Sequence, residues 1–533
     1  MDAVIYYGGP ILTMEPGPDP EAVLVREGRI EAVGPLEKCL SLAPRARRFC
    51  LDGSALLPAF LDPHSHVTSL ASTLGLCDLS AAKSFDEIVL ALRGFLAANP
   101  PAPGGWISGF GYDHNFLREK QHPTRQLLDL VSADIPILIS NASGHMGVAN
   151  SAALRAMGIT ADTPDPEGGL IGREPGSREP GSREPNGYLE ETAFTSTGSR
   201  APRPTMEQRV AQLCRAQEIY FSHGITTIQD GLTRDADWAL LQTAADQGRL
   251  QADIVSYIDL QQCRGLAQDN PRLKQYRGHL KLGGYKIFLD GSPQGRTAWM
   301  SQPYQGADDG YRGYPIHSDA AVRDFMAAAL EDDVQILAHC NGDAAAQQML
   351  DAYAAAVKKT GRGGIRPVMI HAQLLRADQL PQLAELGMFA SFFVAHTWQW
   401  GDIHIENFGM PRAARISPVG SALRAGVPYT FHQDTPVLPP DMIDTLFCAV
   451  NRVTRSGVQL EQSERIGVLE ALRGVTVNAA AQYFEENEKG TLAPGKRADL
   501  VLLSEDPRAV PSEALRRVQV LETFKDGVSV WRA

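Results

Sequence analysis

The chain has 533 residues, 44% of them hydrophobic and 21% charged, and a formal net charge of −12. This length exceeds what one simple core holds, so we expect two or three domains. The acidic balance argues against a nucleic-acid partner, which needs a basic surface, and against an anionic-membrane partner. No uncharged run approaches the ~20 residues that span a bilayer, and the first residues lack the pattern of a secretory signal. Seven scattered cysteines without a CxxC pair suit a reducing compartment, so we expect a cytoplasmic protein.

Both ends of the chain are rich in short strand-like runs. Residues 1–55 contain AVIYYG, ILTM, AVLVREGRIEAVG and RRFCLDG, and residues 485–533 contain ADLVLLS and VQVLETFKDGVSVWRA. Glycine and proline separate these runs, as is typical of turns between strands. We therefore predict that 1–55 and 485–533 together form one small β-sandwich domain.

The middle of the chain alternates short apolar runs with helix-like stretches. The eight apolar runs are at 56–63, 225–230, 252–259, 284–290, 334–339, 367–372, 388–396 and 427–434. Most of the gaps hold amphipathic segments such as DADWALLQTAADQGR and DAAAQQMLDAYAAAVKK. Eight buried parallel strands with intervening helices predict an α/β fold, a (β/α)₈ barrel over residues 56–484, with a doubly wound open sheet as the structural alternative.

One connection is too long for a single helix. Residues 77–205 contain elements of their own, such as the strand IPILIS and the helix NSAALRAM, and indicate an inserted subdomain. Because the insertion follows the first barrel strand, we expect it to roof the active site. The tandem REPGS, REPGS, REPNG at 173–187 has the composition of an exposed loop, and its role is open.

The segment LDPHSHV places two histidines at the end of the first barrel strand. His64 and His66 are two residues apart, so in an extended chain both rings point to the same side. Two imidazoles on one face can chelate a metal such as zinc. An HxH pair alone is weak evidence, because core histidines are common.

Other polar side chains stand at the ends of later strands. His339 closes VQILAH, His371 closes PVMIH, Asp434 closes PYTFHQD, and Lys286 lies within the apolar run GYKIFLDG. A salt-bridged lysine, satisfied core histidines and a capping aspartate would explain each one singly. Together they fall on strands one, four, five, six and eight, at the carboxyl ends that form the active-site face of a barrel.

The order HxH, Lys, His, His, Asp resembles the amidohydrolase superfamily. The resemblance extends to amidohydrolase family 3, the YtcJ-like branch that includes N-substituted formamide deformylases. The stretches that carry it are LPAFLDPHSH, GHMGVANSAAL, GITADTPDPEGG, KIFLDGSPQGRTA, HCNGDAA, IHAQLL, WGDIH, HQDTPVLPP and GTLAPGKRADLVLL. They run in order along nearly the whole chain, and the REPGS duplication is the main departure.

The resemblance implies a ligand set for one or two divalent metal ions, zinc being the first candidate. One ion would lie at His64, His66 and Asp434, and a second at His339 and His371. Lys286 would bridge them as a carbamate formed with carbon dioxide, which replaces a buried cation by an anionic oxygen ligand. Asp434 would also be the catalytic acid and base.

Further residues are candidates for contact with substrate. His145 lies in the inserted segment, His396 ends the seventh strand and Trp398 follows it, and Arg296 and Tyr304 lie in the glycine-containing loop after the fourth. A structural role is the alternative for each, above all for the aromatic side chains.

The function that these residues predict is metal-dependent hydrolysis of a C–N bond, in a linear amide or N-substituted formamide, by attack of a metal-bound hydroxide. Asp434 would take up the proton and pass it to the departing nitrogen. The alternatives are hydrolysis of a cyclic amide, carbamate or ester, deamination at the same centre, and a non-catalytic protein that keeps the fold. We expect a small amide-like molecule as partner and a homodimer as the assembly to test.

Overall fold

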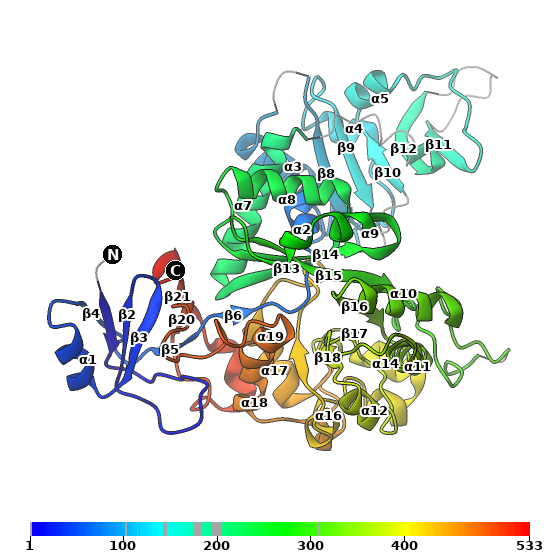
Figure 1. Ribbon diagram of the computed structural model, residues 1–533. Coiled ribbons are helices and arrows are strands. Elements are labelled where there is room, and N and C mark those ends of the chain that lie inside the picture. The colour runs from blue at the N-terminus through cyan, green and yellow to red at the C-terminus, as the bar shows by residue number, and fades with distance from the viewer. Residues whose placement is uncertain are drawn as a thin grey trace. The chain divides into compact units, whose positions relative to one another are not determined.

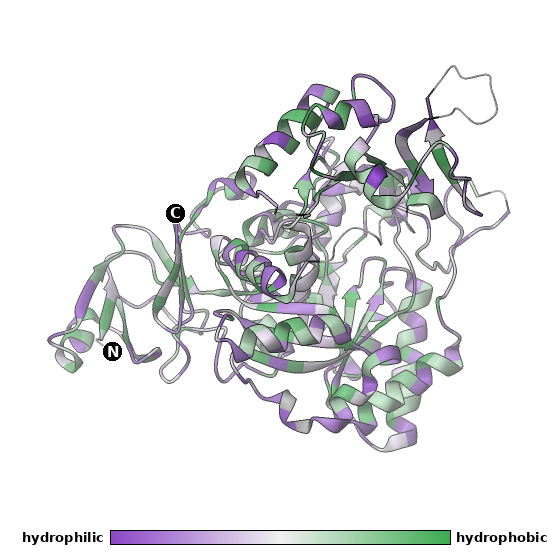
Figure 2. Cartoon of the chain, turned by 90° about the horizontal axis from the view of Figure 1, so that it is seen from above, coloured by the Kyte–Doolittle hydropathy of each residue, from purple (hydrophilic) through white to green (hydrophobic). Residues whose placement is uncertain are grey.

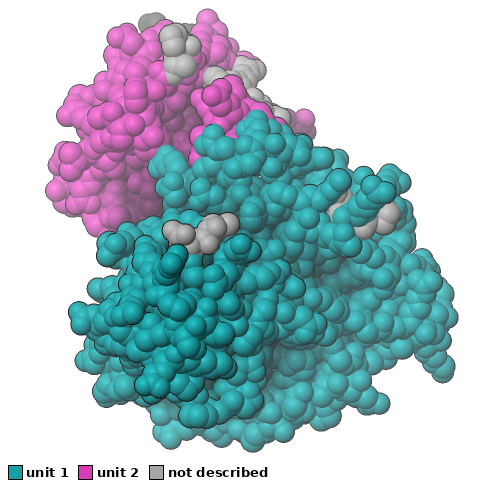
Figure 3. All heavy atoms as spheres, turned by 60° about the vertical axis from the view of Figure 1, so that its left-hand side comes forward, with its two compact units in different colours: residues 1–70, 213–533 teal, residues 71–212 magenta. Residues whose placement is uncertain are grey.

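The computed structural model describes residues 3–101, 104–114, 116–141, 146–174, 184–194, 204–307 and 309–533. It divides into two compact units, residues 1–70 with 213–533 and residues 71–212, which Figure 3 colours separately. His145 lies outside the described residues, as do residues 175–183 of the duplication. Within the described ranges, no helix combines the length and apolar character that crossing a membrane requires.

A curled sheet of eight parallel strands forms the centre of the first unit (Figure 1). Its strands follow one another in chain order: β6 (Phe60–Leu61), β13 (Ile225–Thr233), β14 (Asp253–Asp259), β15 (Leu280–Phe288), β16 (Gln335–Cys340), β17 (Val368–His371), β18 (Phe389–Phe392) and β19 (Tyr429–Phe431). A doubly wound sheet would reverse its strand order at a switch point, so the sequential order rules that alternative out. Each of the eight predicted runs contributes a strand to this sheet.

The first of those runs divides between two sheets. Residues Ala55–Pro58 form β5, which pairs antiparallel with β20 (Leu500–Leu503), whereas β6 pairs parallel with β13. The change of partner strand falls between two adjacent residues. Ala59 N donates to Asp499 O, whereas Phe60 N donates to Gly224 O. Residues 55–61 are all buried, so the run has no periodicity that could reveal the division.

Helices occupy most connections between the parallel strands. Figure 2 shows hydrophobic and hydrophilic residues on different sides of several of them, as expected for helices that cover a sheet. The helices between the strands are α8 (Asp235–Asp246), α9 (Leu260–Asp269), α10 (Asp319–Glu331), α11 (Asp343–Thr360), α12 (Leu380–Glu385), α13 (His396–Gln399), α14 (Gly401–Phe408), α15 (Met410–Ala413) and α16 (Val419–Arg424). After β19 come α17 (Met442–Asn451), α18 (Val468–Gly474) and α19 (Val477–Gln482). Helix α7 (Met206–Ser222) precedes β13.

The two chain ends build two four-stranded sheets. One has the order β3-β2-β1-β4 and the other β22-β21-β20-β5. The strands of these sheets not yet introduced are β1 (Val4–Tyr7), β2 (Ala22–Arg26), β3 (Arg29–Gly34), β4 (Arg47–Cys50), β21 (Val520–Lys525) and β22 (Val528–Arg532). Helix α1 (Leu36–Leu42) lies between β3 and β4 in the chain. Tyr6, Val23, Leu56, Leu500 and Phe524 belong to one hydrophobic cluster, so the two sheets share a core.

The second unit contains a six-stranded sheet of order β11-β12-β10-β9-β8-β7. The strands are β7 (Cys77–Asp78), β8 (Ile107–Tyr112), β9 (Ile137–Asn141), β10 (Met146–Ala149), β11 (Gly169–Arg173) and β12 (Pro185–Glu191), and the helices are α3 (Phe85–Ala98), α4 (Arg125–Asp129) and α5 (Ser151–Met157). Helix α2 (Val67–Thr73) crosses the boundary between the units. The cap of α5 is local: Asn150 accepts from Ala153 N at its start, and Gly158 takes φ 72° at its end.

Candidate metal centre

Three predicted ligands converge beside the first and last strands of the curled sheet. One potential ligand atom from each of His64, His66 and Asp434 lies within 4.8 Å of the others. Oδ1 of Asp434 is 3.3 Å from Nε2 of His64 and 3.2 Å from Nε2 of His66. Two ligands on one tetrahedral zinc ion, each ~2.0–2.1 Å from it, stand ~3.3 Å apart. The three side chains therefore have the spacing of ligands that share a cation.

Gln229 determines which ring nitrogen of His64 carries the proton. The sequence analysis did not single this residue out. Its side chain is wholly buried in β13, and its Nε2 donates to the carbonyl oxygen of Pro63 at 2.6 Å and to Tyr483 Oη at 3.1 Å. The amide oxygen is therefore the group that faces His64 Nδ1, at 2.6 Å, and it accepts a hydrogen bond from the N–H of that nitrogen. His64 Nε2 is left with a lone pair, and it lies 3.3 Å from Asp434 Oδ1 and 3.2 Å from Lys286 Nζ.

This arrangement fits a cation better than it fits the protein alone. Two acceptors, His64 Nε2 and Asp434 Oδ1, lie 3.3 Å apart; the amine of Lys286 is within hydrogen-bond distance of His64 Nε2, at 3.2 Å, but Oδ1 has no hydrogen-bond donor among the described residues. Facing lone pairs repel each other unless a positive charge lies between them. A bound divalent ion would remove that conflict.

Replacing Gln229 by Leu should weaken metal binding about 10- to 100-fold, the usual cost of losing a group that orients a metal-bound histidine. Without the amide oxygen, the His64 proton can move to Nε2 and block the ligand atom. Competition with a chromophoric chelator measures the affinity. Gln482→Leu is the matched control, because Gln482 is another buried amide that donates to Pro63 O, at 2.8 Å, but does not hydrogen bond to His64. Equal affinities for the two variants would contradict this role of Gln229.

The other three predicted ligands lie on the middle strands. Lys286 is 1% exposed on β15, and its Nζ is 3.2 Å from His64 Nε2. His339 Nδ1 on β16 and His371 Nε2 at the end of β17 are 3.1 Å apart, a separation at which two nitrogens share one proton or one cation. The ring centroids of His64 and His371 are 5.9 Å apart. All six predicted ligands therefore belong to one connected group.

Two ligands occupy left-handed backbone conformations. His371 has φ 72° and Asp434 has φ 55°. Such a conformation costs a non-glycine residue of order 1–3 kcal/mol and concentrates at functional sites. Asp434 lies three residues beyond the end of β19, so its position comes from the turn rather than from the strand that the sequence predicted to end with it.

Burial favours the neutral form of four imidazoles at this site, and the neutral form is the one that binds metals. It lowers the pKa of His64 and His371 well below the ordinary value, that of His339 to about 4 and that of His432 to about 3. Burial also lowers the pKa of Lys286 to about 7. The site therefore presents nitrogen lone pairs and one carboxylate rather than a set of cations.

Two further residues shape the backbone around the ligands. The buried carboxylate of Asp290 accepts from the main-chain nitrogens of Asn341, Gly342 and Trp299 at 2.9, 2.7 and 3.0 Å, which fixes the turn after His339. Gly231 lies against His64, where an added Cβ would stand 2.6 Å from the ring. In the sequence, Asp290 is an acidic residue at the end of an apolar run. Only the tertiary structure shows which main-chain nitrogens donate to its carboxylate.

The predicted substrate-contact residues lie in different surroundings. His396 does not end the seventh strand: β18 stops at Phe392, and His396 begins α13, buried, with its ring 6.1 Å from that of His371. Trp398 packs edge-on against Phe447 and beneath the guanidinium of Arg516. Tyr304 is buried, donates to Ala298 O and carries the guanidinium of Arg296 over its ring, at 5.3 Å.

Two buried polar side chains that the sequence analysis missed, Gln373 and His404, lie near His396. Gln373 Nε2 is 2.8 Å from His404 Nε2, and the rings of His396 and His404 are 6.0 Å apart. Among the described residues, Gln373 Oε1 and the Nδ1 atoms of His396 and His404 have no hydrogen-bond partner. His432, two residues before Asp434, packs its ring 5.1 Å from that of His64.

The chain is similar to known proteins over nearly its whole length. The N-substituted formamide deformylase of Arthrobacter pascens is 30% identical over 529 residues, covering 95% of this chain and 94% of that protein. YtcJ of Bacillus subtilis (strain 168) is 27% identical over 538 residues, with 99% of both chains covered. The fold is that of an uncharacterized metal-dependent hydrolase from Pyrococcus furiosus, with a TM-score of 0.76, 23% identity and coverage of 95% of this chain and 100% of that one. The model of the amidohydrolase family matches residues 51–531, and the chain belongs to that family of hydrolases.

Proposed function

We propose that the protein hydrolyses the C–N bond of a linear amide, with an N-substituted formamide as the first substrate class to try. The observation that supports this most is the shared position of His64, His66 and Asp434, a carboxylate oxygen 3.3 and 3.2 Å from two imidazole nitrogens. The deformylase of Arthrobacter pascens, similar over nearly the whole length, directs the choice of substrate.

A divalent ion at this centre, zinc in the first instance, would polarise the scissile carbonyl and make water acidic enough to attack near neutral pH. The nitrogen lone pairs of His64 and His66 would hold it together with Asp434. His339 and His371 would hold a second ion if both positions fill. Nitrogen-rich sites of this kind suit zinc.

Asp434 is the group that we assign to proton transfer. Its Oδ1 has no hydrogen-bond donor among the described residues, so it can accept a proton from the attacking water. Amide nitrogen leaves poorly as an anion, and the same carboxyl can pass the proton to it. The product amine then departs neutral or protonated.

Lys286 is proposed to react with carbon dioxide through its neutral amine. The new N–C bond forms as the amine loses one proton, and the product is a carbamate with two oxygen ligands. The position in an apolar strand beside His64 favours this reaction, since an unpaired ammonium is costly there and would repel a cation.

One experiment tests the function as a whole. Metal content is measured on purified protein from metal-supplemented cultures, together with a screen of N-formyl, N-acyl and N-aryl amides and matched esters. We expect about one to two ions per chain and turnover of an amide, with both lost in a His64→Ala, His66→Ala variant that still melts cooperatively. Fewer than about 0.2 ions per chain in the unchanged protein would refute the metal centre.

On sequence grounds, residues 77–205 are proposed to set substrate choice, because they lengthen the connection that directly follows His64 and His66. His145→Ala should lower kcat/KM by about tenfold or more, as expected for a lost hydrogen bond to substrate. Deletion of one REPGS unit should leave kcat/KM nearly unchanged. Equal, large losses in both variants would show that the duplication has a role.

A further inference from the structure

The two histidines of the HxH pair are held in different ways. The ring of His64 is fixed through its Nδ1 by the amide of Gln229. The ring of His66 lies 3.2 Å from Asp434 and has no other hydrogen-bond or ion-pair partner in the part of the chain that the structure describes. The direction of this ring therefore depends on the main chain on either side of it. On the N-terminal side the main chain is anchored, because His66 N donates to Thr435 O at 2.8 Å.

On the C-terminal side, His66 stands at the start of helix α2. Its carbonyl oxygen accepts the first helical hydrogen bond, from Leu70 N at 2.9 Å, so His66 occupies the N-cap position. An N-cap side chain normally accepts from a main-chain N–H group in the first turn of its helix. The imidazole of His66 lies against Asp434 instead. Another group must therefore accept from the first turn of α2.

Asp230 on β13 is the group that accepts from α2. Its Oδ1 accepts from Thr68 N at 3.1 Å and from Thr68 Oγ1 at 2.8 Å. Its Oδ2 accepts from Thr233 Oγ1 at 2.5 Å. Ser256 Oγ donates to Thr233 Oγ1 at 2.7 Å, which leaves the single hydroxyl proton of Thr233 for Asp230. Both oxygens of this carboxylate are thus acceptors, and one of them holds the second residue of α2.

The end of β13 fixes where Asp230 stands. Gln229 O accepts from Ser65 Oγ at 3.1 Å, and Gly231 N donates to Ser65 O at 2.7 Å. Asp230 itself is wholly buried, and its three donors are a main-chain N–H and two hydroxyl groups. A buried carboxylate is costly unless it is hydrogen bonded, so Asp230 and Thr68 each depend on the other. Three consecutive residues of β13 therefore hold the segment that carries the HxH pair.

We infer that Asp230 is a positioning residue for the metal centre. By capping α2 from a neighbouring strand, it takes over the N-cap role of His66 and leaves that imidazole free to bind a cation. Without Asp230, the first turn of α2 loses its acceptor, and the main chain that directs the His66 ring can shift. The inference rests on the proposed metal centre but not on the reaction that takes place there.

The test measures the affinity of the full-length, metal-stripped protein for cobalt(II) by competition with a chromophoric chelator. Asp230→Ala should bind cobalt about 10- to 100-fold more weakly than the unchanged protein, the usual effect of losing a group that orients a metal ligand.

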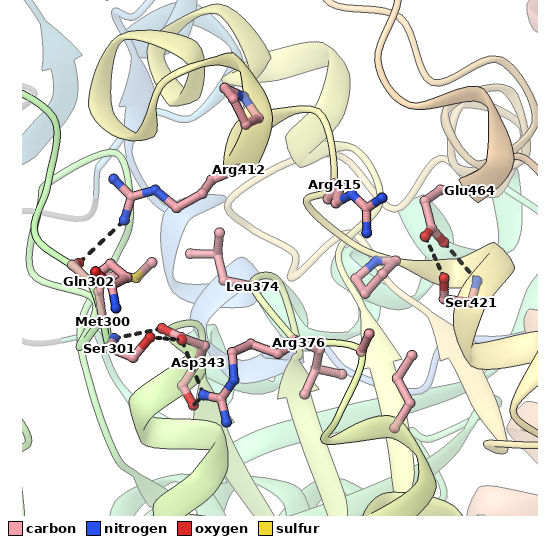
Figure 4. A pocket seen from close by; sticks show the side chains of 15 residues that line it. Met300, Ser301, Gln302, Asp343, Leu374, Arg376, Arg412, Arg415, Ser421 and Glu464 are labelled. Carbon is pink, nitrogen blue, oxygen red and sulfur yellow. Dashed lines mark hydrogen bonds and ion pairs between the residues drawn. The ribbon is translucent and has the colours of Figure 1, made fainter.

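Glu464→Ala is the matched control. Glu464, in the wall of the cavity in Figure 4, is another buried carboxylate that serves the first turn of a short helix, α16. It accepts from Ser421 N at 2.7 Å and from Ser421 Oγ at 2.5 Å, as Asp230 accepts from the N and Oγ1 of Thr68. The control variant loses the same kind of contact but should keep the cobalt affinity of the unchanged protein.

Two further readouts separate positioning from a general loss of structure. At saturating cobalt, Asp230→Ala should absorb visible light more weakly than Glu464→Ala, because an ion that loses a histidine takes up water in its place. Asp230→Asn keeps an oxygen that can accept from Thr68, so it should regain most of the affinity. Thr68→Val removes only the hydroxyl donor and keeps the fold if Asp230→Ala does not; it should lower the affinity by about two- to tenfold.

The outcomes distinguish this inference from the metal centre on which it rests. Unchanged cobalt affinity in Asp230→Ala, or in Thr68→Val where the alanine variant does not fold, would overturn the inference alone. Equal cobalt absorption in Asp230→Ala and Glu464→Ala would also overturn it. Failure of the unchanged protein to bind cobalt would refute the metal centre and the inference together.

Discussion

Replacing Lys286 by Ala should reduce kcat/KM by about three orders of magnitude or more, the scale expected when a metal-dependent hydrolase loses a bridging ligand and its charge. Lys286 lies buried on β15 with Nζ 3.2 Å from His64 Nε2, so its removal leaves a hole beside the ligands rather than at the surface. Steady-state kinetics on the best amide from the screen measures the loss. Acetate or propionate should restore part of the activity, because a small carboxylate can occupy the hole and supply the missing oxygen ligands.

Lys286→Arg distinguishes a carbamate from a cation. Arginine keeps the positive charge but cannot form the carbamate, so this variant should be as inactive as the alanine variant. Unchanged protein equilibrated with ¹³C-bicarbonate should give a carbamate carbonyl resonance that Lys286→Arg lacks. Full activity in Lys286→Arg would mean that the group acts as a cation.

Replacing Lys489 by Met should destabilise the first unit by about 3–5 kcal/mol, the usual effect of removing one partner from a buried ion pair. Lys489 Nζ is 2.6 Å from Asp253 and 2.7 Å from Glu485, and all three are buried. Lys525 Nζ is 2.8 Å from Asp253 and 2.9 Å from Asp499, which ties β14 of the curled sheet to β21 of the terminal sheet and to the residue before β20. Thermal melting measures the change, and exposed Lys359→Met on α11 is the control.

The pH dependence of this effect follows from the direction of the pKa shifts. Burial alone would raise the pKa of Asp253, but Lys489 and Lys525 hold it well below its ordinary value. Its contribution is therefore present above the unfolded pKa of ~3.9 and is lost as pH falls through the lower folded value. The pKa of Lys489 is raised: burial opposes the shift, and Asp253 and Glu485 outweigh it. That contribution is full below ~10.4 and disappears as pH rises through the higher folded value.

The difference in melting temperature between Lys489→Met and the unchanged protein should therefore be largest between about pH 4 and pH 10. It should shrink in acid, because protonated carboxylates no longer need the lysine. A difference that is constant down to pH 2 would show that lost packing, rather than lost charge pairing, dominates the effect.

The sequence determined the parts of this protein that depend on local pattern. Short apolar runs with amphipathic segments between them predicted the eight parallel strands in order, and stretches such as DAAAQQMLDAYAAAVKK predicted helices such as α11. The carboxyl ends of parallel strands meet at one edge of a sheet, which is why strand position predicted a common face for His64, His66, Asp434 and the other strand-end residues; the family resemblance supplied the grouping of these three, which lie together. The match of the amidohydrolase family model to residues 51–531 confirmed the family that those residues indicated.

Only the tertiary structure decided features that depend on which buried polar atoms meet. The run at 55–61 divides between two sheets because uniform burial erases periodicity, so only the partner strands settle its pairing. Gln229 is a polar residue in an apolar strand, but its role follows from the direction of its amide, which Pro63 and Tyr483 fix from elsewhere in the chain. Asp253, one partner of Lys489, likewise comes from a segment distant in sequence. Sequence spacing specifies which side chains share a strand end, whereas hydrogen-bond partners and charge balance are set by long-range packing.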